Sequence, residues 1–124
     1  MLVRVLIADD NDQVRSMISE IMRSEGWLVC GSFADGQTAI EKAAELKPDV
    51  VVLDFQMPRR DGISAACAIR VFLPHVPVFI FTLFANPYLD EEAKRLGLNG
   101  IIPKGNIEAL TSAIRSALPR GSSY

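Results

Sequence analysis

Residues 50–54 read Val50-Val51-Val52-Leu53-Asp54, an apolar run that ends in a carboxylate. A strand that is buried on both faces has such a run, which is typical of a parallel sheet covered by helices. Residues 3–8 form a second, largely apolar run, and Asp9 and Asp10 follow it. Because the functional crevice of such a sheet lies beyond the carboxyl ends of its strands, we expect Asp9, Asp10 and Asp54 to meet at one edge.

Strand-like runs alternate with helix-like stretches five times along the chain. We expect strands at Leu2–Ala8, Trp27–Phe33, Val50–Asp54, Val78–Thr82 and Gly100–Ile102. Apolar residues spaced three and four apart, together with cap and turn residues, indicate the helices between them. These helices are expected over residues 14–22, after the turn Asp35-Gly36, over Gly62–Leu73, from Asn86-Pro87 to near Gly97, and over Ile107–Leu118. The pattern predicts an α/β fold of the (βα)5 type, a doubly wound parallel sheet with right-handed crossovers.

The composition is that of an ordinary globular chain of about one domain, with 124 residues, 49% hydrophobic and 23% charged. A net charge of -2 argues against bulk attraction to nucleic acid, so we expect no direct nucleic-acid contact. We expect one domain over residues 1–118. The last residues, 119–124, are expected to form a tail or the start of a linker.

Several features favour a cytoplasmic protein that does not enter the membrane. No apolar run approaches the roughly 18 residues of a membrane span, and the first residues lack the pattern of a secretory leader. Cys30 and Cys67 have no CxxC spacing. We therefore expect both to be free thiols.

Two further strand ends carry chemically useful groups, the hydroxyl of Thr82 and the ammonium of Lys104. Clustered carboxylates without nearby His or Cys suit a hard ion, Mg²⁺ before Zn²⁺. A divalent ion, a Lys and a hydroxyl donor together suit the oxygens of a phosphoryl group. A carboxylate can accept that group as an acyl phosphate. Asp54 is the best acceptor because it stands alone on its strand.

The ordered set Asp9-Asp10, Asp54-Phe55-Gln56-Met57-Pro58, Asp61-Gly62, Thr82 and Lys104 resembles the receiver domain of two-component response regulators. The resemblance covers residues 2 to about 118. It implies the flavodoxin-like strand order 2-1-3-4-5 in three α/β/α layers, and a phosphorylation-dependent switch rather than an enzyme with a separate substrate.

The resemblance also implies roles for individual residues. Asp54 would take a phosphoryl group from a sensor histidine kinase or a phosphotransfer protein. Asp10, Asp54 and the backbone carbonyl of Gln56 would bind Mg²⁺ directly, and Asp9 would act through a metal-bound water. Thr82 would be the switch hydroxyl, and Lys104 would contact the phosphoryl group. The fourth helix, fifth strand and fifth helix would change their contacts, including those of a homodimer.

Three positions depart from the family's usual pattern. Leu83 follows Thr82 where the family commonly has a small residue, and Ile101 stands where it commonly has Tyr or Phe. Pro103 precedes Lys104 instead of following it. Pro103 removes a donor from its strand, which an edge strand tolerates best.

Two other functions stay open at this point. The first is a Mg²⁺-dependent phosphatase of the haloacid dehalogenase-like type, which also uses an Asp nucleophile after a parallel strand. That class needs a second Asp two residues later, and Gln56 occupies that position after Asp54, although Asp10 and Asp12 have the right spacing. The second is a receiver-like interaction module that works without phosphorylation, which Leu83 and Ile101 leave open.

Overall fold

The computed structural model describes residues 2–119, and in this range five strands alternate with five helices. The strands are β1 (Arg4–Ala8), β2 (Leu28–Phe33), β3 (Val50–Leu53), β4 (Val78–Thr82) and β5 (Gly100–Pro103). The helices are α1 (Asp12–Ser24), α2 (Gly36–Leu46), α3 (Gly62–Phe72), α4 (Pro87–Arg95) and α5 (Ile107–Ala117). The predicted (βα)5 alternation is confirmed. Residues 120–124 of the predicted tail lie outside the described residues.

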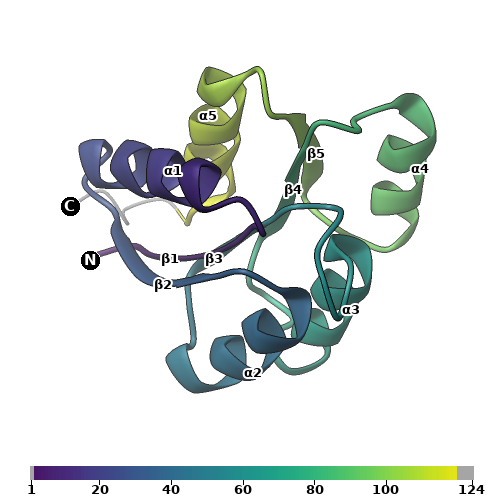
Figure 1. The fold of residues 1–124 in the computed structure, drawn as a ribbon, viewed down its shortest axis with the longest axis horizontal. Coiled ribbons are helices and arrows are strands. Elements are labelled where there is room, and N and C mark those ends of the chain that lie inside the picture. Colours follow the sequence, from purple (N-terminus) through teal and green to yellow (C-terminus); the bar gives the residue numbers. More distant parts are fainter. Residues whose placement is uncertain (1, 120–124) are drawn as a thin grey trace.

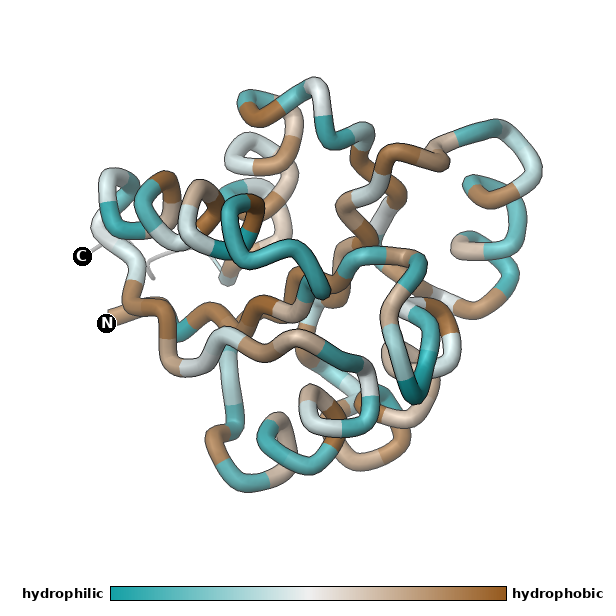
Figure 2. Tube along the Cα trace, viewed as in Figure 1, coloured by the Kyte–Doolittle hydropathy of each residue, from teal (hydrophilic) through white to brown (hydrophobic). Residues whose placement is uncertain are grey.

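All strand pairs are parallel, and the order in the sheet is β2-β1-β3-β4-β5, as predicted. Helices α1 and α5 cover one face of the sheet, and α2, α3 and α4 cover the other (Figure 1). The strand β3 is at the centre of the three layers, and its side chains are no more than 1% exposed. Figure 2 shows the apolar strands in the interior and polar residues on the outer helix faces.

The helix starts share one local cause. Each helix follows an Asn or Asp whose side-chain oxygen accepts a hydrogen bond from a backbone amide three residues later, the usual N-cap, which typically stabilises a helix by about 1 kcal/mol. The cap and donor pairs are Asn11 with Val14, Asp35 with Thr38, Asp61 with Ser64, Asn86 with Leu89, and Asn106 with Ala109.

Small differences from the expected strand bounds have local reasons. The amide of Trp27 donates to the carbonyl of Met22, so Trp27 belongs to the turn after α1 and β2 begins one residue later. Asp54 lies just beyond the last residue of β3. Pro103 extends β5 by one residue, pairs with Thr82 and lies on an edge strand, where its missing donor is tolerated.

Within residues 2–119, no helix combines the length and the apolar character needed to cross a membrane.

Candidate functional site

Strand register brings the carboxylates together. Ala8 of β1 lies opposite Leu53 of β3, so the next residue of each strand, Asp9 and Asp54, leaves the sheet at the same edge. The amide of Asp54 donates to the carbonyl of Ala8 over 2.9 Å, which extends the pairing by one residue. The predicted meeting of these strand ends is what the structure has.

One carboxylate oxygen from each of Asp9, Asp10 and Asp54 can be chosen so that all three lie within 4.8 Å of one another. Asp9 and Asp54 are buried, at 1% and 7% exposure, whereas Asp10 is exposed. Backbone amides hold the two buried groups. Asn11 donates to Oδ1 of Asp9 over 2.9 Å, and Phe55 donates to Oδ1 of Asp54 over 2.8 Å. In each, Oδ2 is left to face a cation.

That cation is the ammonium of Lys104. Its Nζ lies 2.7 Å from Oδ2 of Asp9 and 3.3 Å from Oδ2 of Asp54. Burial alone would lower the pKa of Lys104, but the close carboxylate of Asp9 and the charge of Asp54 hold that pKa above its ordinary value. Lys104 is therefore a fixed positive charge in the site.

One ammonium does not neutralise this cluster. Burial, followed by the charge of Asp9, raises the pKa of Asp54 despite the opposing effect of Lys104. Oδ2 of Asp9 is buried and, although it faces Lys104 at 2.7 Å, it accepts no hydrogen bond of good geometry. The three carboxylates therefore offer only oxygen ligands, carry more negative charge than Lys104 can neutralise, and include one buried oxygen without a hydrogen bond. Such a set fits Mg²⁺.

Thr82 is fully buried at the end of β4. Its Oγ1 accepts a hydrogen bond from the amide of Phe84 over 3.1 Å, and its carbonyl accepts one from the amide of Lys104 over 3.0 Å. The hydroxyl therefore holds the start of the loop that leads to α4, and its carbonyl ties that loop to the residue that carries the ammonium.

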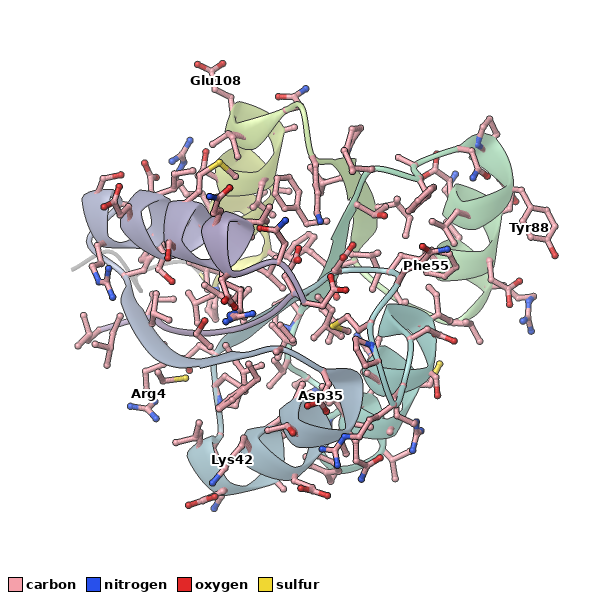
Figure 3. The ribbon with its side chains drawn as sticks, viewed as in Figure 1. Arg4, Asp35, Lys42, Phe55, Tyr88 and Glu108 are labelled. Carbon is pink, nitrogen blue, oxygen red and sulfur yellow. The ribbon has the colours of Figure 1, made fainter. Side chains whose placement is uncertain are left out.

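A cleft of about 380 Å³ opens above the carboxylates. Its floor is polar and its walls are partly apolar, with Asp10, Asn11, Val14, Met17, Asp54, Gln56, Leu83, Phe84 and Lys104 as lining residues. Leu83 is 76% exposed and stands at the wall of the cleft, so its bulk does not fill the space over Asp54. Phe55, labelled in Figure 3, packs instead on the core beneath α3 and α4.

The sequence model of the response regulator receiver domain matches residues 5–115. The chain belongs to this family. It is 40% identical over 121 residues to the transcriptional regulatory protein PdtaR of Mycobacterium tuberculosis, and the alignment covers 94% of this chain and 57% of PdtaR. It is 35% identical over 101 residues to the chemotaxis protein CheY of Thermotoga maritima, and the alignment covers 82% of this chain and 84% of CheY.

Solved structures agree with the family assignment. The response regulator domain of Thermotoga maritima CheB superposes with a TM-score of 0.87 at 31% identity, covering 94% of this chain and 96% of that one. The CheX-CheY-BeF3-Mg complex from Borrelia burgdorferi superposes with a TM-score of 0.89 at 26% identity, covering 95% and 90%. The chain is thus a receiver domain of the kind that acts as a phosphorylation-dependent switch. It spans only a little over half of the PdtaR sequence.

Most of the site residues that were predicted from the sequence lie together at the cleft. Asp9, Asp10, Asp54 and Lys104 come together as expected, and Gln56 lies at the same cleft. The prediction did not include the apolar wall. Met17 has the apolar spacing of the first helix, but it is 39% exposed and lines the cleft with Val14. Their place in the first turns after Asp10 is the signal that could have found them.

Proposed function

We propose that Asp54 is the phosphoryl acceptor of this receiver and that a histidine kinase or a histidine phosphotransfer protein is the donor. The observation that supports this most is the position of Asp54, which is buried, lines the cleft and lies between two acidic residues and the ammonium of Lys104. A structural neighbour, the CheX-CheY complex from Borrelia burgdorferi, contains BeF3 and Mg²⁺. Beryllium fluoride stands in for a phosphoryl group, so that complex supports the same chemistry for the matching cleft here.

The transfer is a displacement at phosphorus. A carboxylate oxygen of Asp54 attacks the phosphorus of a phosphohistidine, an O–P bond forms, the N–P bond breaks, and the imidazole keeps the electron pair. Lys104 would offset the charge on the phosphoryl oxygens, since its Nζ already lies 3.3 Å from Oδ2 of Asp54. The Thr82 hydroxyl would donate a hydrogen bond to a phosphoryl oxygen after turning away from the Phe84 amide, from which it now accepts one.

Mg²⁺ would be held by Asp10, Asp54 and the backbone carbonyl of Gln56, with Asp9 acting through a bound water. When present, the ion neutralises charge on the phosphoryl oxygens. Asp10 is exposed and reaches the cleft from the β1–α1 loop. The buried Asp9 is already engaged by Lys104, which supports an indirect role for Asp9.

The experiment that tests the function is incubation of the purified chain with a small phosphodonor and Mg²⁺, followed by intact mass measurement. We expect one phosphoryl adduct that is labile to base, as an acyl phosphate is, and that does not form with a chelator present. An unmodified chain under conditions that label a second receiver in the same tube would favour the phosphorylation-independent module. Steady release of phosphate from added phosphate monoesters would favour the phosphatase, for which the comparisons give no support.

Mg²⁺ binding should be visible as added stability. At about ten times its Kd, an ion that binds only the folded chain stabilises it by about 1.4 kcal/mol, a rise of roughly 3–8 °C in Tm. Asp10→Ala should remove most of this gain, because it removes a direct ligand. Asp12→Ala is the matched control, since Asp12 is a nearby acid that does not belong to the carboxylate cluster. Thermal melts at millimolar Mg²⁺ and with chelator measure both, and equal gains in the two variants would contradict the assignment of Asp10.

Output is proposed to pass through the loop after Thr82 to α4, and from there to the surface of α4, β5 and α5, where a homodimer or a partner protein binds. Ile101 is partly buried against the core beneath α4 and has no ring to rotate. Tyr88 projects from α4 away from the domain and is 81% exposed (Figure 3). Sedimentation with and without beryllium fluoride at several concentrations tests the dimer.

We include a cytoplasmic location in the proposal, because Cys30 and Cys67 are unpaired, as in reducing compartments.

A further inference from the structure

The loop between β3 and α3 carries the proposed acceptor and is held by several backbone hydrogen bonds. The amide of Gly62 donates to the carbonyl of Phe55 over 2.7 Å, which closes the loop at its base. The carbonyl of Pro58 accepts bonds from the amide of Arg60 over 2.8 Å and from the amide of Gly36 over 3.3 Å. The last of these joins the loop to the first residue of α2.

Arg59, in the middle of this loop, has a left-handed backbone with φ of 68°. Within residues 2–119, the one other non-glycine residue with positive φ is Lys47, which is the C-cap of α2, a usual place for this conformation. Arg59 caps no helix. A left-handed backbone is unfavourable for a non-glycine residue, and such strain persists only where the surroundings hold it.

The side chain of Arg59 shows what holds it. Its Nε donates to Oδ1 of Asp35 over 3.0 Å, and its second guanidinium nitrogen donates to Oγ1 of Thr38 over 2.7 Å. Asp35 is itself held in place by Thr38. Its Oδ1 accepts a hydrogen bond from the amide of Thr38 over 2.7 Å, and its Oδ2 accepts one from the hydroxyl of Thr38 over 2.9 Å. Figure 3 labels Asp35 at the start of α2.

The contacts of the Arg59 side chain oppose the strain of its backbone. The ion pair of Arg59 and Asp35 lies near the surface, with side chains 54% and 22% exposed, where an ion pair contributes little to overall stability. The hydrogen bond from the guanidinium to Thr38 adds to the hold on the loop. Between this turn and Asp54, Met57 packs on the core and the ring of Pro58 fixes its own φ. Gln56 itself is exposed, so the position of its carbonyl depends on how the flanking loop is held.

We propose that Arg59 is a positioning residue: the hold of Asp35 and Thr38 on its guanidinium maintains the left-handed turn that sets the Gln56 carbonyl beside Asp54. This rests on the proposed function, because that carbonyl is a proposed Mg²⁺ ligand. The start of α2 thereby becomes part of the phosphoacceptor site although none of its residues lines the cleft.

Arg59→Ala removes the guanidinium but keeps a Cβ, so the left-handed conformation stays unfavourable while its side-chain contacts are lost. Asp35→Asn keeps the helix cap while removing the charge that binds Arg59. We expect each to weaken Mg²⁺ binding by about threefold to tenfold, somewhat less than typical for residues that orient metal ligands. The double variant should be no weaker than either single one, because both changes break the same contact. Lys47→Gly is the control, since it relieves a left-handed residue at the far end of α2 and should leave Mg²⁺ affinity unchanged.

Two readouts separate this proposal from the proposed function. Titration calorimetry gives Mg²⁺ affinity, and amide resonances of residues 55–58 in the metal-free chain report the loop directly. Common shifts of these resonances in both single variants, with weaker Mg²⁺ binding, support the positioning role. Unchanged shifts and affinity in Arg59→Ala, with a wild-type chain that binds Mg²⁺, would overturn the role of Arg59 alone. Effects that multiply in the double variant would also overturn it. A wild-type chain that binds no Mg²⁺ would instead overturn the proposed metal site.

Discussion

Replacing Asp54 with Asn is expected to abolish the acyl phosphate completely while the domain stays folded. An amide oxygen is a very weak nucleophile toward phosphorus. Among residues 2–119, no other carboxylate both lines the cleft and lies beside Lys104, since Asp9 is buried beneath the cleft and Asp10 is exposed. The measurement is intact mass after incubation with a small phosphodonor and Mg²⁺. An adduct on the Asp54→Asn chain under conditions that label the wild type would show that the acceptor is a different residue.

The same variant should be at least as stable as the wild type when Mg²⁺ is absent. Burial first, and the charge of Asp9 second, raise the pKa of Asp54 above its unfolded value. An acid with a raised folded pKa binds its proton more tightly in the folded chain, so the wild type loses stability as the pH rises through this interval. The amide side chain of the variant carries no charge to desolvate, so its advantage should be largest above that interval and vanish below it. Chemical denaturation at several pH values in chelator measures this, and a less stable variant at neutral pH would contradict it.

The architecture was predictable because each strand that carries a functional residue is apolar on both faces. A run such as residues 50–53 has no amphipathic alternative, so the strand, and with it the position of Asp54 at its end, follow from local pattern. Parallel strands end at the same edge, which places Asp9, Thr82 and Lys104 near Asp54 without knowledge of the tertiary structure. The caps at Asn86 and Asp61 were readable for the same local reason.

The finer features depend on contacts between residues far apart in the sequence. Asp9 and Asp10 are identical in type and adjacent, yet one is buried against Lys104 and the other exposed, a difference set by strand packing. The left-handed turn at Arg59 was not readable, because turns of this kind are usually marked by glycine. Its partner, Asp35, is far away in the sequence, at the N-cap of α2. The sequence predicted a helix that begins at Gly62, but the need for glycine there comes from the close approach of the Asp54 backbone.

Gly62→Ala is expected to be strongly destabilising, although Gly62 is the first residue of α3 and an alanine there would normally favour the helix. A Cβ at this position would lie 2.1 Å from the carbonyl oxygen of Asp54 and 2.9 Å from its carbonyl carbon. Both are backbone atoms in the loop that carries the acceptor, so neither can turn away as a side chain would. Relief requires α3 and the Asp54 loop to separate. We expect a loss of about 2–3 kcal/mol in the free energy of unfolding.

Gly105→Ala is the matched control, because a Cβ there meets nothing within 4 Å although the residue is next to Lys104. Its free energy of unfolding should stay within about 0.5 kcal/mol of the wild type. Gly62→Ala should also weaken Mg²⁺ binding, since the shifted backbone carries both Asp54 and Gln56, whereas Gly105→Ala should leave it unchanged. Urea denaturation and Mg²⁺ titration of the two variants give both quantities. If Gly62→Ala proved as stable as Gly105→Ala, the tight contact between α3 and the acceptor loop would not exist in solution, and this route for fixing Asp54 would have to be abandoned.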